Sequence, residues 1–147
     1  MIKTIYVANT AEAFGDQLEA VNMTEEGKTW IRHELALSQR ALLWGSDHKA
    51  VITSHPIPQA LLEHNIRVVG YSEVIALAPA LLGVNLSSAI LQDCTLLDTI
   101  AEMARLNTTL NLSPYAITGS FVQLVNTLNQ QGTKVTLGEM ARTPKFA

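Results

Sequence analysis

Cysteine is nearly absent from the sequence, since Cys94 is the only one among 147 residues. An intramolecular disulfide is therefore impossible, and a single thiol cannot complete a cysteine-based zinc site. His33, His48 and His64 are scattered without metal-ligand spacing, so no metal site is predicted. The amino-terminal residues lack the long apolar stretch and cleavage site of a signal peptide, and we therefore predict a cytoplasmic protein.

Charged residues are also scarce, at 16% of the chain where about 25% is typical. The net charge of −3 gives no electrostatic reason to expect nucleic acid or an anionic membrane as a partner. The most apolar window, residues 68–91, contains Glu73, Pro79, Gly83 and Asn85, so no membrane span is predicted. The shortage of charge also indicates that another domain or subunit covers part of the surface.

Glycine-rich phosphate loops are missing as well. Neither Gly-x-Gly-x-x-Gly nor Gly-x-x-x-x-Gly-Lys-[Ser/Thr] occurs, which excludes the two best-defined phosphate-binding motifs. Polar residues nevertheless follow two predicted strands, Asn9 and Thr10 after the first and Ser54 and His55 after the second. Ligands of open α/β sheets bind at such strand ends. The same residues also fit a polar strand exit and a strand-to-helix turn, and a Ser beside a His in sequence is not by itself a catalytic pair.

The pattern along the chain predicts one α/β domain. Short β-branched runs alternate with helical patterns, which is typical of a mostly parallel sheet with helices covering its faces. Strands are expected at 2–9, 50–53, 67–71 and 133–137, with extended pieces at 114–117 and, as strand or helix end, at 41–44. Helices are expected at about 11–21, 24–39, 56–63, from 95 onward and at 121–128, the last ended by Gly132, while 75–86 is apolar and irregular.

The expected core is aliphatic, with one aromatic ring packed on it. Its predicted members are Ile5, Val7, Val51, Ile52, Val68, Val69 and Val135 from strands, and Phe121, Leu124 and Leu128 from the last helix. Thr24 is predicted to begin its helix as the N-cap, and Trp30, Ile31, Leu35 and Leu37 are expected to point inward. Cys94 is expected to be a small structural residue at a helix start, and Asp93, Asp98 and Glu102 to form a solvated acidic side of that helix.

Four segments occur in a distinctive order. They are Arg40-Ala-Leu-Leu-Trp44 before a strand ending at Ser54-His55-Pro56, Leu91-Gln-Asp93 with Leu96-Leu97-Asp98, Pro114-Tyr115-Ala-Ile-Thr118 before Phe121-Val-Gln-Leu124-Val125, and Arg142-Thr-Pro-Lys145. In this order the chain resembles the pre-ATP-grasp domain of ATP-grasp carboxylate–amine ligases, especially the peptide-ligase-like branch. The resemblance spans nearly the whole chain. Where such ligases carry Gly-Ser-Lys-Ser before the catalytic core, this sequence has Thr-Pro-Lys-Phe, and the core itself is missing.

This resemblance implies a Rossmann-like sheet of about four to six strands in residues 1–141. Residues 142–147 would be the start of a missing ATP-grasp domain or a tail. The full ligase would use ATP and magnesium to convert a carboxylate to an acyl phosphate that an amine attacks, whereas no cofactor is expected in this chain alone. The residues implied to line the substrate cleft are Asn9, Thr10, Ser54, His55 and Thr118, and Lys145 is implied to contact the ATP phosphates.

Two other functions stay open. One is a stand-alone Rossmann-like interaction module that dimerises without catalysis, which the low charge content and the apolar stretch 74–86 favour. The other is a small nucleotide or cofactor binder, which the missing glycine motif disfavours. A homodimer is expected through residues 74–82 or a neighbouring patch, because a large apolar patch rarely stays exposed to water and a two-fold pairing is the commonest way to cover one.

Overall fold

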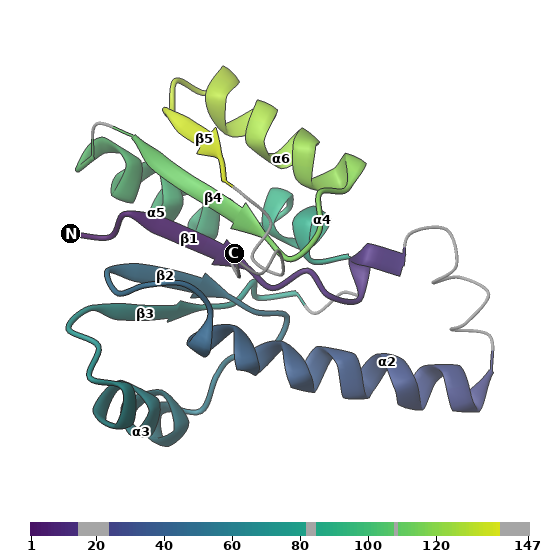
Figure 1. Ribbon diagram of the computed structural model, residues 1–147. Helices are drawn as coiled ribbons and strands as arrows, with labels where there is room; N and C mark the ends of the chain where they lie inside the picture. The colour runs from purple at the N-terminus through teal and green to yellow at the C-terminus, as the bar shows by residue number, and fades with distance from the viewer. Residues whose placement is uncertain (15–23, 82–84, 108, 139–147) are drawn as a thin grey trace, which may run out of the picture.

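The computed structural model describes residues 1–14, 24–81, 85–107 and 109–138. Its centre is a five-stranded sheet in the order β3-β2-β1-β4-β5, and every neighbouring pair is parallel (Figure 1). The strands are β1 (Thr4–Val7), β2 (Lys49–Ile52), β3 (Val74–Leu77), β4 (Leu110–Pro114) and β5 (Val135–Leu137). The helices are η1 (Glu12–Phe14), α2 (Glu25–Leu37), η2 (Ser38–Leu43), α3 (Gln59–Val69), α4 (Leu86–Leu91), α5 (Cys94–Arg105) and α6 (Gly119–Gln130), where η denotes a 3₁₀ helix.

Alternation along the strands sends side chains into two separate cores. On one face Ile5 and Val7 of β1 pack with Ile52 of β2 and with apolar residues of α4, α5 and α6. On the other face Val51 packs with Ala41 and Leu42 of η2, and side chains of α3 join them. Because successive strand residues point to opposite faces, this division places helices on both sides of the sheet. The α/β, Rossmann-like fold predicted from the sequence is confirmed.

Side chains with oxygen acceptors begin most of the helices. Thr24 accepts from Gly27 N at 2.9 Å, Asn85 from Ser88 N at 2.9 Å, Asp93 from Leu96 N at 2.9 Å and Thr118 from Phe121 N at 3.1 Å. Each bond satisfies an amide that the first turn leaves without an intrahelical partner. The prediction for Thr24 is confirmed, whereas the helix expected from Thr95 begins with Asp93 as its N-cap.

The predicted strand at 67–71 is wrong. Residues through Val69 belong to α3, which Gly70 ends with a left-handed backbone, φ 83°. Val68 and Val69, expected in the core, are 70% and 47% exposed. Two β-branched residues favour a strand locally, but α3 begins after Pro58 and meets no helix breaker before Gly70, so tertiary context overrides the propensity.

Other boundaries also differ from expectation. The stretch 75–86 contains β3, residues 41–44 belong mainly to the 3₁₀ helix η2, and β4 starts before the extended piece expected at 114–117. Leu37, expected to point inward, is 47% exposed, and Cys94 lies exposed at the start of α5. The helix predicted at 11–21 is represented by η1, and the rest of that stretch lies outside the described residues. The remaining predicted core residues are buried: Ile5, Val7, Val51, Ile52, Phe121, Leu124, Leu128 and Val135.

The apolar stretch 74–82, predicted to form a dimer contact, is partly used within the domain. Val74 packs against one core and Leu77 against the other, while Leu81 is 66% exposed and Leu82 lies outside the described residues. Within the described part of the chain, no helix is both long and apolar enough to cross a membrane.

Candidate functional site

The carboxyl ends of the strands bring most of the residues singled out from the sequence to one edge of the sheet. Asn9 and Thr10 follow β1, Ser54 and His55 follow β2, and Thr118 follows β4. The chain leaves β1 toward β2 on one side and later returns to β4 on the other, so the strand order reverses between β1 and β4. Ligands of open α/β sheets bind beside such a reversal point.

Asn9 joins the ends of β1 and β4. Its side-chain oxygen accepts from Tyr115 N at 2.9 Å and from Ala116 N at 3.2 Å. Its amide nitrogen donates to Ala116 O at 2.9 Å and to Glu12 Oε2 at 3.0 Å. Asn9 is 1% exposed, so all of these bonds lie within the protein and the side chain is committed to the fold.

Glu12, which sequence reasoning missed, is the centre of this cluster. Its carboxylate is buried, at 2% exposed, and accepts four hydrogen bonds. Ser87 donates twice, from N to Oε1 at 2.7 Å and from Oγ to Oε2 at 2.8 Å, and Asn9 and Thr118 donate to Oε2 as well. Because every partner is a donor, the contacts match an ionised carboxylate, which is acceptor-only.

Thr118 links this carboxylate to a helix start. Its hydroxyl donates to Glu12 and accepts from Phe121 N at the beginning of α6. We call Asn9, Glu12, Ser87 and Thr118 the Glu12 cluster. It ties β1, α4 and α6 together, and it places a carboxylate at the reversal point, where a phosphate would be repelled. The one local hint in the sequence is the spacing Asn9-x-x-Glu12, which resembles a capping box.

Thr10, Ser54 and His55 lie outside the Glu12 cluster. Thr10 and Ser54 are buried, and the Thr10 hydroxyl lies 3.5 Å from Glu34 O. The Thr53 hydroxyl donates to His55 O at 2.6 Å and so fixes the turn after β2. His55 is half-buried, and its Nδ1 is buried without a hydrogen-bond partner among the described residues. Within the same residues no hydrogen bond joins Ser54 to His55, so a catalytic Ser–His pair is not formed.

Lys145 lies outside the described residues. Among the residues that the structure does describe, no three histidine, cysteine, aspartate or glutamate side chains gather closely enough to hold a metal ion.

A second buried charge lies at the opposite edge of the sheet and was also missed. Lys49, the first residue of β2, is 0% exposed. Its Nζ donates to Leu42 O at 2.6 Å and Trp44 O at 2.7 Å, and it lies 4.1 Å from the centre of the Tyr71 ring. Burial lowers the pKa of this amine to about 8, although the nearby charge of Asp47 acts in the other direction. These contacts end η2 and hold it against the sheet.

Comparisons with protein-family models, with curated proteins and with solved structures give no match to this chain.

Proposed function

We propose that the chain is the amino-terminal, substrate-cleft domain of an ATP-dependent carboxylate–amine ligase, in which a separate ATP-grasp domain carries out catalysis. The observation that carries the proposal is the division of the carboxyl edge of the sheet. The half at β1 and β4 is closed by the Glu12 cluster, whereas the half at β1 and β2 carries the half-buried ring of His55, with Thr10 and Ser54 buried. Such an edge supplies one wall of a cleft and leaves the opposite wall to another domain.

The residues of this edge do not fit ATP and magnesium. Glu12 would repel a phosphate at the reversal point, and its carboxylate oxygens already accept four hydrogen bonds, which leaves them committed rather than available to a metal. Nucleotide and metal are therefore assigned to the partner domain. In a ligase of this class, ATP activates the carboxylate as an acyl phosphate, and attack by the amine then releases phosphate.

The part left to this chain is to bind and orient the substrate. His55 is half-buried, and we assign to its ring the contact with a substrate carboxylate or amine. Because the turn after β2 is fixed by the Thr53 bond to His55 O, the ring is held on a rigid strand end. The resemblance in the order of the segments 40–56, 91–98, 114–125 and 142–145 supports the same assignment.

The test combines binding and activity. The purified chain is titrated with ATP and magnesium by calorimetry, and it is then mixed in turn with each ATP-grasp domain encoded in the same genome. We expect no ATP binding tighter than about 1 mM by the chain alone. We expect one mixture to release ADP in the presence of amino acids or small carboxylates, and His55→Ala to raise the KM of that reaction. Micromolar ATP binding by the chain alone, or no chain-dependent ADP release in any mixture, would contradict the proposal.

A dimeric interaction module without catalysis remains the second candidate. The observation that favours it is the edge strand β3, which ends in a segment where Leu81 is 66% exposed. If this segment forms a two-fold contact, Leu81→Glu should convert a dimer to a monomer with an unchanged melting temperature. Analytical ultracentrifugation measures the change. A parent chain that is already monomeric at high micromolar concentration rules out this contact.

A further inference from the structure

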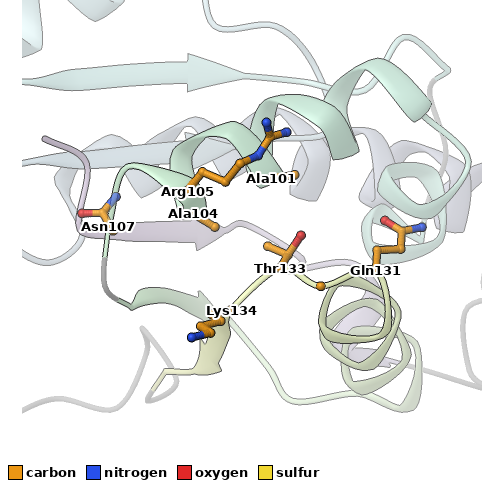
Figure 2. A pocket seen from close by; sticks show the side chains of 8 residues that line it. Ala101, Ala104, Arg105, Asn107, Gln131, Thr133 and Lys134 are labelled. Carbon is orange, nitrogen blue, oxygen red and sulfur yellow. The ribbon is translucent and has the colours of Figure 1, made fainter.

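A hollow of about 670 Å³ lies between the last turn of α5 and the turn that joins α6 to β5 (Figure 2). Its residues directly precede β4 and β5, so it lies at the amino-terminal ends of these strands. Thr10, Ser54 and His55 lie at the opposite, carboxyl-terminal ends of the strands. Its size falls within the range of about 300–1,000 Å³ that is usual for small-molecule sites. It plays no part in the function proposed above.

The floor of the hollow is held rigidly. Asn129 binds both backbone groups of Val135, accepting from its N at 3.0 Å and donating to its O at 3.2 Å. Gly132, with φ 85°, supplies the left-handed turn after α6. Thr133 and Lys134 lie between these fixed points. A ligand that binds them would therefore lose little free energy in ordering the loop.

Two cations from different elements reach this hollow. Arg105 comes from the end of α5 and Lys134 from the end of the turn before β5, and no carboxylate is among the residues that line the hollow. Glu102 contacts Arg105 Nη1 at 3.1 Å, which leaves other N–H groups of the guanidinium to donate. Lys134 has no ion pair among the described residues. In a chain of net charge −3, this is a locally cationic surface.

Carbonyl groups at the ends of α5 and α6 are hydrogen-bonded within the protein. Carbonyl oxygens at a helix end normally favour cations. In α5, Met103 O accepts from the Asn107 side chain at 2.7 Å and Ala104 O from Asn107 N at 3.2 Å. In α6, Leu128 O accepts from Thr133 N at 3.1 Å. These carbonyl groups are therefore paired, and Arg105 in the last turn of α5 supplies the cation that such a helix end favours.

We propose that this hollow binds a small phosphate monoester. The exposed side chains of Arg105 and Lys134, whose charged ends point apart in Figure 2, would turn toward the hollow to receive the phosphate oxygens, and the Thr133 hydroxyl would add a donor. Ala101 and Ala104 line the α5 side with small methyl groups. That wall leaves room for the carbon part of the ligand and gives it an apolar contact.

The test is a titration of the isotope-labelled full chain, followed by NMR amide shifts. Three probes are used separately at low salt: inorganic phosphate, adenosine monophosphate and glucose 6-phosphate. We expect saturable shifts centred on residues 101–107 and 131–134, with the two esters binding more tightly than inorganic phosphate. Lys134→Gln and Arg105→Gln should each weaken binding by roughly three- to tenfold. Arg32→Gln, an exposed charge change on α2, is the matched control and should have no effect.

Several outcomes would overturn the proposal. No saturation below about 10 mM with any probe excludes a site of useful affinity. Equal binding by the esters and inorganic phosphate removes the role of the alanine wall. Shifts centred on residues 9–12, 54–55 or 116–118 place the ligand at the other edge of the sheet. Because the two sites lie at opposite edges, failure here leaves the ligase proposal intact, and failure of the ligase proposal leaves this hollow unaffected.

Discussion

Glu12 and Lys49 are both buried charges, and they lie at opposite ends of the strands. Glu12 lies beyond the carboxyl end of β1, and Lys49 lies at the amino end of β2. Neither has an ion-pair partner among the described residues. Glu12 is surrounded by donors, whereas Lys49 is surrounded by carbonyl oxygens and an aromatic ring. In each place neutral dipoles replace the water that the charge loses on burial. The comparison shows two ways to stabilise a buried charge without a counter-ion.

The two sites differ in how far along the sequence their partners lie. Glu12 binds Ser87 and Thr118, which are 75 and 106 residues away. Lys49 binds carbonyls five and seven residues away. They also differ chemically, because Lys49 can lose its proton and still donate to both carbonyls, whereas Glu12 uses both of its oxygens as acceptors, one of them for the backbone N–H of Ser87. Glu12 is therefore expected to contribute more to the stability of the whole fold.

The largest effect is expected for Glu12→Gln. The new amide keeps one acceptor oxygen and replaces the other with an NH₂ group, so either the backbone N–H of Ser87 or the donors at the other oxygen would lose their acceptor. We expect a loss of roughly 2–4 kcal/mol in the free energy of unfolding, measured by urea denaturation. Glu26→Gln, at an exposed position in the first turn of α2, is the control and should change stability by less than about 0.5 kcal/mol. Equal stability of the two variants would show that the Glu12 cluster is not cooperative.

A smaller effect is expected for Lys49→Met. The substitution leaves the carbonyls of Leu42 and Trp44 without their donor, which costs stability. It also removes a buried charge, which returns part of that cost. We expect a net loss of about 1–3 kcal/mol in urea denaturation at pH 7, less than for Glu12→Gln. Lys28→Met, on the exposed side of α2, provides the control. A variant more stable than the parent would mean that desolvation of the ammonium outweighs its hydrogen bonds.

The pH dependence of stability separates the two charges further. The pKa of Lys49 is lowered from 10.5 to about 8 by burial. Between these values the unfolded chain binds more protons than the folded one, so the contribution of Lys49 to stability rises with pH. The parent should therefore gain stability from pH 8 to pH 10 relative to Lys49→Met. Burial also raises the pKa of Tyr71, so stability falls as the pH rises above the usual tyrosine pKa near 10. The comparison of parent and variant is therefore made below about pH 10. Parallel profiles for parent and variant would refute this assignment.

The same contrast explains what the sequence could and could not predict about the fold. Helix α6 was predictable because Phe121, Leu124, Val125 and Leu128 repeat with helical spacing. The strands β1, β2 and β5 were predictable from short β-branched runs. The strand predicted at 67–71 failed because a helix begun eight residues earlier continues to Gly70. The composition of residues 67–71 does not show that a helix has already begun at Gln59.

The candidate site was predictable in position but not in contacts. Asn9, Ser54, His55 and Thr118 were selected because they follow strands, and they do lie at one edge of the sheet. That Asn9 and Thr118 are committed to Glu12 depends on pairings across more than 100 residues. Lys49 was missed for a related reason. In the sequence, a lysine beside an apolar run is typical of a solvated strand start. The burial of Lys49 depends on the carbonyl groups of Leu42 and Trp44, which only the fold brings to it.

The smallest effect is expected at Tyr71, and it tests whether the ring or the carbonyls hold Lys49. Tyr71→Leu removes the aromatic face 4.1 Å from Nζ, and a cation–π contact of this kind contributes roughly 0.5–1 kcal/mol. Tyr71→Phe keeps the face and removes only the hydroxyl, so it serves as the matched control. We expect Tyr71→Leu to lose about that amount in urea denaturation at pH 7 relative to Tyr71→Phe. Without the ring the charged amine is less favourable, so the pH-dependent gain should also begin at a lower pH in the leucine variant. Identical stability and identical profiles for the two variants would assign Lys49 to the two carbonyls alone, and the charge would then be held entirely by η2.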